Sequence, residues 1–234
     1  MSAIRSDLGW STRERITVRG KDLPREILGT LNLGDMAWFE LTGSFPDEKQ
    51  SRLFNAMAVT LVEHGVTPSA LAARLTYLGA PEAMQAAVAA GLCGLGSVFV
   101  GSMEGCAKLL SEGKTAKQIV AENKRIPGLG HPLHKPVDPR TVRLFEIARE
   151  TGYHGRYCRL MEEIAELKKL TLNATGAIGA LACELGLDWR AVRGIGVMAR
   201  AVGLVGHLLE ESRQPMAEAV WHQIEDQACR HLKP

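Results

Sequence analysis

Residues that could bind an anion concentrate in one segment, 126–140, which reads Ile-Pro-Gly-Leu-Gly-His-Pro-Leu-His-Lys-Pro-Val-Asp-Pro-Arg. Its glycines can expose backbone N–H groups, its prolines stiffen the chain, and it carries His131, His134, Lys135 and Arg140. A rigid, cationic loop suits a small anionic ligand, but composition alone equally allows a surface connector with incidental charges. Two histidines are too few to indicate a metal site, so we predict none.

The charge, apolar pattern and cysteine content of the whole chain bear on its partners and its location in the cell. The 234 residues include 28 Lys and Arg against 26 Asp and Glu, a net charge of +2 without a long run of one sign, so we expect no nucleic acid partner. No run of about 18 apolar residues and no apolar segment behind an N-terminal basic patch occurs, so we expect neither a membrane span nor secretion. Five cysteines without a close pair favour a reducing, cytoplasmic location.

Helical patterns surround the loop. Apolar residues repeat at helical spacing from Asp47 until Gly65, and Thr67 offers the cap of a second helix. Thr115 and Gln118 form a capping-box pair. Further helices are expected over 81–94, 97–112, 115–123, 174–186 and 188–212, with two more around 144–148 and 160–167. Because strand-like alternation is almost absent beyond a small piece at 16–18, we predict an all-α fold without a parallel sheet.

The expected helix over 188–212 contains four glycines, namely Gly194, Gly196, Gly203 and Gly206. Each interior glycine costs about 1 kcal/mol relative to alanine. A helix that accepts this cost is approached closely by another element, and we expect a helix of a second subunit there.

The loop closely resembles the Gly-x-Gly-His…Asp-Pro-Arg signature of the citrate synthase superfamily. The resemblance is strongest to the citryl-CoA lyase module of ATP-citrate lyase and to stand-alone citryl-CoA lyases. Five other segments are similar to the family's Tyr-Arg-Gly, Leu-Leu-x-Gly-x-Leu-Pro, Asp-His-Gly, Asn-Val-Asp and Arg-x-x-Gly motifs. They are residues 18–23, 41–46, 63–65, 173–179 and 200–203, in the family's order.

The resemblance implies a citrate synthase-like fold with two helical domains. Residues 1–105 and 180–234 would form the large domain. Residues 106–179 would form an inserted small domain that carries the coenzyme A loop. Because the family dimerises through large-domain helices, we expect a homodimer. Coenzyme A would enter as a thioester substrate, with a dicarboxylate as the other small molecule and no metal.

The resemblance also assigns roles by position. His131 would bond the oxygen that is the ketone of oxaloacetate or the hydroxyl of the citryl group, and would accept the hydroxyl proton during cleavage. Arg140 and Arg200 would hold the two free carboxylates, with His64 as a further donor. Without the resemblance, His64 reads as a helix-terminal residue and Arg200 as a charge on a helix surface. The remaining expected site residues are Ile126, Pro127, Gly128, Leu129, Gly130 and Lys135 for coenzyme A, Phe99 and Asn173 for substrate, and Thr175 at the catalytic position.

Two positions depart from the synthase pattern. Synthases polarise the acetyl thioester with a histidine in a Gly-Pro-Leu-His-Gly motif, but segment 96–101 has Phe99 there, which cannot donate a hydrogen bond. A similar phenylalanine occurs in the ATP-citrate lyase module, and this favours a lyase. Thr175 replaces the family's catalytic aspartate and is a poor acid or base at neutral pH. Residues 214–221 also lack an arginine to lend to a partner's site.

We therefore predict a carbon–carbon lyase that cleaves citryl-CoA, or a related 3-hydroxyacyl-CoA, to acetyl-CoA and oxaloacetate or another keto acid. One alternative is a non-catalytic binder of coenzyme A thioesters, which Phe99 and Thr175 favour. A small citrate synthase is the other, and the same two residues disfavour it. No glycine-rich phosphate loop for ATP-driven activation is present, so a separate reaction must supply the thioester.

Overall fold

Helices dominate the protein in the computed structural model, which describes residues 4–232. Three short strands near the N-terminus, β1 (Gly9–Ser11), β2 (Ile16–Val18) and β3 (Lys21–Asp22), pair antiparallel in the order β1-β2-β3. The predicted all-α class is confirmed. The small strand at 16–18 is confirmed as well, and no parallel sheet occurs within residues 4–232.

Several helices begin at the local signals that the sequence offered. Thr67 caps α3, and Asp47 and Thr115 each form a capping box. Two helices, α1 and α11, were not predicted: α1 was missed although Asn32 caps its start and Gly43 its end, whereas α11 has no side-chain cap. The helices are α1 (Leu33–Thr42), α2 (Glu48–Val62), α3 (Pro68–Gly79), α4 (Met84–Cys93), α5 (Gly101–Leu110), α6 (Ala116–Glu122), α7 (Pro139–Thr151), α8 (Arg156–Lys168), α9 (Ala174–Glu184), α10 (Trp189–Arg213) and α11 (Ala217–Ala228), with a π-helical turn at Leu23–Ile27 and a 3-10 turn at Arg230–Leu232.

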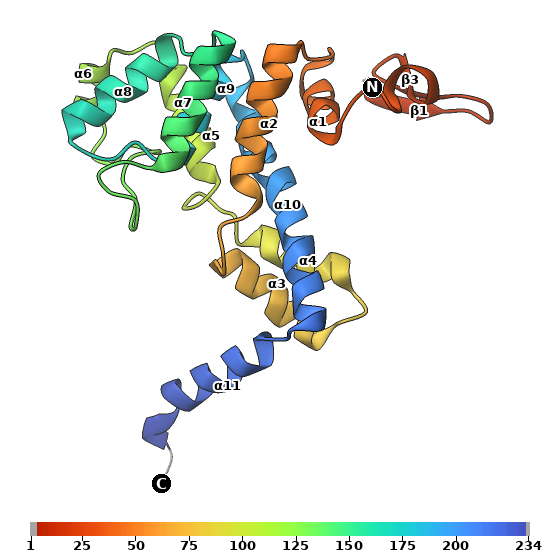
Figure 1. The fold of residues 1–234 in the computed structure, drawn as a ribbon, viewed down its shortest axis with the longest axis vertical. Helices are drawn as coiled ribbons and strands as arrows, with labels where there is room; N and C mark the ends of the chain where they lie inside the picture. The colour runs from red at the N-terminus through yellow and green to blue at the C-terminus, as the bar shows by residue number, and fades with distance from the viewer. Residues whose placement is uncertain (1–3, 233–234) are drawn as a thin grey trace.

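The long helix α10 connects two packed regions (Figure 1). Its first half packs in an upper body with α2, α5 and α9, and its second half packs against α3 and α4 below. The hydrophobic cores follow this arrangement. One large cluster fills the upper body, and a small cluster joins Ala73 and Ala87 to Leu204 and Leu208. Helix α11 and the strands at the N-terminus project from opposite sides (Figure 1).

The predicted domain borders, after residues 105 and 179, fall inside α5 and α9. Both helices belong to the large hydrophobic cluster, which contains Cys106 and Ala107 beside one border and Ala180 beside the other. The division into 1–105 with 180–234 and an inserted 106–179 stays a prediction.

Two of the four glycines in α10 are explained within the chain. A Cβ at Gly203 would overlap the carbonyl oxygen of Val62, and one at Gly196 would crowd Val100 and Met103. A Cβ at Gly194 or Gly206 would meet no atom of residues 4–232 within 4 Å. By length and composition α10 could cross a membrane, with a mean hydropathy of 1.4, but half of that window is buried inside the protein. The prediction that the chain does not span a membrane stays a prediction.

Candidate active site

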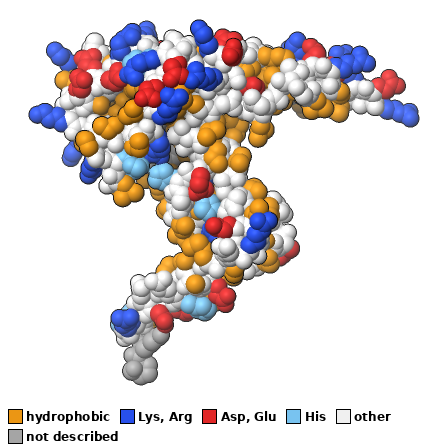
Figure 2. Space-filling view, viewed as in Figure 1, with side chains coloured by type: hydrophobic (Ala, Val, Ile, Leu, Met, Phe, Trp, Pro, Cys, Tyr) orange, Lys and Arg blue, Asp and Glu red, His pale blue; other side chains and the backbone are white. Residues whose placement is uncertain are grey.

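A cleft of about 1110 Å³ lies where the loop, α5, the start of α9 and α10 meet. All the predicted site residues except Lys135 line it, and Figure 2 shows histidine side chains gathered below the upper body. Lys135 is exposed and lies in a neighbouring groove with Val142 and Phe145. The residues that share the cleft are His64, Phe99, Ile126, Pro127, Gly128, Leu129, Gly130, His131, Arg140, Asn173, Thr175 and Arg200.

The loop is fastened to the start of α9. Gly128 and Gly130 adopt φ values of +88° and +82°, and a Cβ at Gly128 would overlap the backbone of Gly176. The N–H of Asn173 donates to the carbonyl of Gly128 at 3.0 Å, and its side-chain amide donates to the carbonyl of Gly130 at 2.6 Å. Gly130 donates in turn to the carbonyl of Thr171 at 2.7 Å. These bonds fix the backbone that leads into His131.

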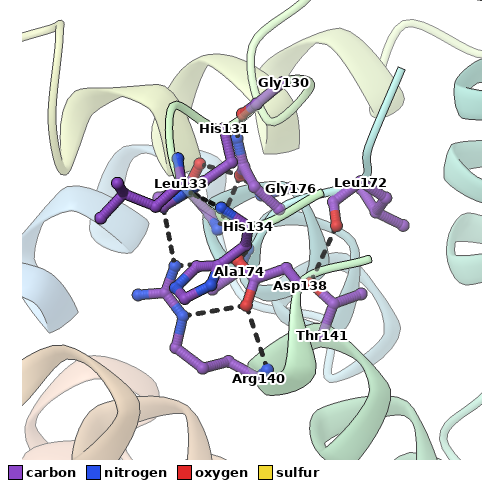
Figure 3. A network of polar contacts seen from close by, with 12 residues as sticks. Gly130, His131, Leu133, His134, Asp138, Arg140, Thr141, Leu172, Ala174 and Gly176 are labelled. Atoms are coloured by element: carbon purple, nitrogen blue, oxygen red, sulfur yellow. Dashed lines mark hydrogen bonds and ion pairs between the residues drawn. The ribbon is translucent and has the colours of Figure 1, made fainter. Parts of the chain in front are cut away.

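Asp138 holds the Arg140 side chain in place (Figure 3). It is fully buried and accepts hydrogen bonds from the backbone N–H of Arg140 at 3.0 Å and of Ala174 at 3.0 Å. The guanidinium of Arg140 adds bonds of 3.0 Å from Nε and 2.8 Å from Nη2. Burial acts to raise the pKa of Asp138, but the bonds from Arg140 and Ala174 outweigh it and hold the pKa below its usual value. The carboxylate therefore stays charged and aims Arg140 at the cleft.

His131 is fixed in one tautomer by the backbone (Figure 3). Its Nδ1 faces the N–H groups of Leu133 at 3.1 Å and His134 at 2.9 Å, so Nδ1 is the acceptor and the proton of the neutral ring lies on Nε2. Burial lowers the pKa of His131, and His134 and Arg140 lower it further, against the opposing effect of Asp138. The ring therefore stays neutral at pH 7. In this tautomer it offers a donor at Nε2 rather than a free basic nitrogen, and the role of His131 as acceptor of the hydroxyl proton stays a prediction.

His131 Nε2 and Arg140 Nη2 lie 3.3 Å apart. Both atoms carry hydrogen, so neither can accept from the other. An oxygen placed between them would accept from both. This pair therefore forms an anion or carbonyl oxygen site.

Three histidines meet at the cleft. His64, His131 and His134 each offer a ring nitrogen within 4.8 Å of the others. Three ring nitrogens this close together could hold a metal ion. The sequence had suggested only two of them, because His64 arrives from the end of α2. Two backbone N–H groups occupy Nδ1 of His131, and Arg140 lies beside its Nε2. The cationic surroundings suit an anion better than a cation, and the absence of a metal stays a prediction.

Arg200 brings unsatisfied donors to the cleft. The residue is 8% exposed, and its Nε and Nη1 are buried without a hydrogen-bond partner among residues 4–232. Burial lowers the pKa of Arg200, and the charge of Glu63 opposes this shift. A buried guanidinium with unpaired donors is costly, and an anionic ligand would relieve that cost.

The family described as citrate synthase, C-terminal domain, matches residues 20–220. The chain belongs to the citrate synthase family. The resemblance found in the loop and the five other segments is thereby confirmed, and so is the citrate synthase-like fold.

Within this family, the chain is similar to several solved structures and curated proteins. It is similar to the citryl-CoA lyase from Hydrogenobacter thermophilus, with a TM-score of 0.82 and 35% identity over 90% of this chain and 87% of that one. An ATP citrate lyase from Methanothrix soehngenii, in complex with citrate and coenzyme A, shares the fold with a TM-score of 0.77 at 21% identity, over 91% of this chain and 39% of that one. The curated ATP-citrate synthase subunit 1 of Sordaria macrospora is 26% identical over 221 residues, which cover 82% of this chain. The chain spans 32% of that relative's length.

The position to which the resemblance assigns the family's aspartate holds an uncharged group, Thr175. Thr175 Oγ1 donates to Asn173 Oδ1 at 2.7 Å and lies 3.2 Å from the hydroxyl of Ser102. Ser102 accepts the N–H of Gly128 at 3.0 Å. The hydroxyl of Thr175 has one proton, and the hydrogen bond to Asn173 uses it. Thr175 therefore supplies no acid or base. Phe99, which the resemblance assigns to the position of the synthase histidine, lines the same cleft and is 43% exposed.

Three contributors to the site, Asp138, Ser102 and Glu63, were not predicted, and a fourth, His134, was noted only as part of the cationic loop. Asp138 aims Arg140, Ser102 supports the loop and Thr175, and His134 stacks on His131 with ring centroids 4.4 Å apart. Glu63 binds the backbone N–H groups of residues 64 and 65. The Asp-Pro-Arg segment was a signal for Asp138, whereas nothing in the sequence marked Ser102.

Proposed function

We propose that this chain is a carbon–carbon lyase that cleaves citryl-CoA to acetyl-CoA and oxaloacetate. The observation that carries the proposal is a set of hydrogen-bond donors at the cleft, formed by Nε2 of His131, Nη2 of Arg140 and the unpartnered Nε and Nη1 of Arg200. A citryl group carries two carboxylates and one hydroxyl, which are the acceptors that such donors need. The likeness to a citryl-CoA lyase at 35% identity supports the same reaction.

Coenzyme A would enter as the thioester part of the substrate. A cleft of about 1110 Å³ exceeds the roughly 300–1,000 Å³ of ordinary small-ligand pockets. Several cations along the cleft suit the phosphate groups of coenzyme A, and the apolar side chains of Ile126, Pro127 and Leu129 suit its pantetheine arm. The cations are Lys108, Lys124, Arg125, Lys168 and Arg193.

We assign the base of the cleavage step to His64. It lines the cleft, and no hydrogen bond to its ring occurs within residues 4–232, so a ring nitrogen is available. His64 removes the hydroxyl proton of the citryl group. The resulting oxygen becomes the ketone of oxaloacetate between the donors of His131 and Arg140. The carbon–carbon bond then breaks, and its electron pair forms the enolate of acetyl-CoA. This enolate takes a proton from water.

A second candidate function is supported by Thr175. Because neither Thr175 nor Phe99 can serve the enolate, the chain could bind a coenzyme A thioester without cleaving it. In the proposed lyase, the same two residues slow the return of the proton to the enolate. They also disfavour a synthase, which must form that enolate from acetyl-CoA.

The assay supplies citryl-CoA and follows oxaloacetate with malate dehydrogenase and NADH. We expect release by the wild type and a loss of at least about 100-fold in His131→Ala, because an oxyanion donor is worth this much. Lys135→Ala, outside the cleft, is the matched loop control and retains wild-type activity. Tight binding of citryl-CoA without release by the wild type contradicts the lyase and supports the binder.

We further propose a homodimer built on α10. Its exposed apolar residues Met198, Val202, Val205 and Leu209 follow helical spacing, beside the open positions Gly194 and Gly206. Val202→Asp should yield a monomer by analytical ultracentrifugation, and an unchanged wild-type dimer would contradict this interface. The five free thiols support a cytoplasmic location.

A further inference from the structure

A buried polar cluster lies between α3 and α10, behind the cleft. Arg74 of α3 is 1% exposed, and its guanidinium donates to Nδ1 of His207 at 3.2 Å from Nε and 2.9 Å from Nη2. Its Nη1 donates to Glu211 at 2.6 Å, and Glu210 forms a further ion pair at the surface. Arg74 is therefore neutralised and held in one orientation by residues of α10.

This orientation determines which nitrogen of His207 carries the proton. An arginine offers only donors, so Nδ1 of His207 is the acceptor and the proton lies on Nε2. Nε2 lies 3.2 Å from Oε1 and 3.1 Å from Oε2 of Glu63, to which it donates. His207 thus connects Arg74 to Glu63, a carboxylate at the end of α2, by hydrogen bonds on both sides of its ring.

Glu63 carries the connection to the cleft. Its Oε1 accepts the backbone N–H of His64 at 2.9 Å and that of Gly65. Burial acts to raise the pKa of Glu63, but the hydrogen bond from Gly65 and the interactions with His207 and His64 outweigh it and keep the pKa below its usual value. Gly203 leaves room for this turn, because a Cβ there would overlap the carbonyl of Val62.

We infer that Arg74 and His207 are positioning residues that, through Glu63, hold the His64 backbone so that its imidazole faces His131. The His64 ring lies 6.2 Å from the His131 ring between centroids, and no hydrogen bond to the His64 ring occurs in the described chain. Its placement therefore depends on its backbone, and the backbone depends on Glu63. The catalytic part of this inference rests on the proposed function, but the structural part does not.

Two substitutions at His207 separate the two halves of the connection. In His207→Asn, the amide oxygen takes the place of Nδ1 and can accept from Arg74, but nothing reaches Glu63. The amide nitrogen of His207→Gln takes the place of Nε2 and can donate to Glu63. His154→Asn is the matched control, because His154 is also largely buried and faces a carboxylate, Glu162, at 3.2 Å.

The first measurement is hydrogen exchange of the backbone amides of residues 64 and 65, which needs no activity. We expect His207→Asn to speed this exchange at least about tenfold, and His207→Gln and His154→Asn to change it less than about threefold. Equal exchange in His207→Asn and His154→Asn overturns the inference.

The second measurement is oxaloacetate release from citryl-CoA. We expect His207→Asn to lower kcat at least about tenfold with little change in KM, and His207→Gln to restore most of it. In a His64→Ala background, His207→Asn should cost less than about twofold more, because both act through one residue. A full additional loss in that background overturns the inference. If the wild type releases no oxaloacetate, the proposed function fails, and the exchange measurement alone decides the positioning role.

Discussion

Replacing Asp138 by asparagine is expected to destabilise the fold and disable the site together. The two carboxylate oxygens accept four hydrogen bonds, from Ala174 N and from three nitrogens of Arg140. Asparagine keeps one acceptor oxygen, so two of the four donors face an amide NH₂ group instead. A hydrogen bond to a charged group is worth about 1.5–3 kcal/mol, and a buried pair broken on one side costs about 3–5 kcal/mol. Because the Arg140 side chain is 28% exposed, we expect a loss of about 3 kcal/mol.

The chain contains a matched control for this substitution. Asp188 caps α10 as Asp138 caps α7, and it binds the backbone N–H and guanidinium of Arg190 in the same way, but it is exposed. Urea unfolding followed by circular dichroism should show the loss in Asp138→Asn and a midpoint close to wild type in Asp188→Asn. In the release assay, Asp138→Asn should also lose activity, because Arg140 is no longer aimed. Equal small effects of the two substitutions would refute the argument from burial.

Three other predictions test the site residues. The pKa of Asp138 is lowered in the folded state, so the carboxylate stabilises the fold fully above its unfolded pKa of about 3.9, and this contribution is lost as the pH falls through the folded pKa. In urea titrations, the difference in the free energy of unfolding between wild type and Asp138→Asn should therefore shrink on acidification. A difference that stays constant with pH contradicts this. Arg200→Met should abolish oxaloacetate release while raising the free energy of unfolding by about 1 kcal/mol, because it removes a buried cation whose Nε and Nη1 have no hydrogen-bond partner in the described chain. A destabilised variant would contradict this reasoning. Gly128→Ala should cost about 2–4 kcal/mol in urea unfolding, because the methyl overlaps the Gly176 backbone, whereas Gly113→Ala, with φ of +73° and open space, should cost only about 1–2 kcal/mol; similar costs would mean that the loop can move.

The motifs in the sequence located the site better than they assigned its chemistry. The Gly-x-Gly-His loop, Arg140 and Arg200 were recognised as site residues, and they share one cleft. The resemblance assigned Lys135 to coenzyme A as part of the same loop, but Lys135 lines the neighbouring groove. Adjacent residues of an extended loop can face different sides, and motif matching does not report the direction of a side chain.

Much of the helical framework was determined by the sequence itself, because capping and apolar spacing act between residues within one or two turns. Thr67 and Thr115 begin their helices as predicted for this reason. Only the tertiary structure decided which ring nitrogen of His131 carries the proton, because the N–H groups that face its Nδ1 depend on the path of the folded loop. It also decided that Arg200 has unsatisfied donors and that His207, 144 positions from Glu63, supports the turn of His64. These properties depend on atoms that come together only when the helices pack.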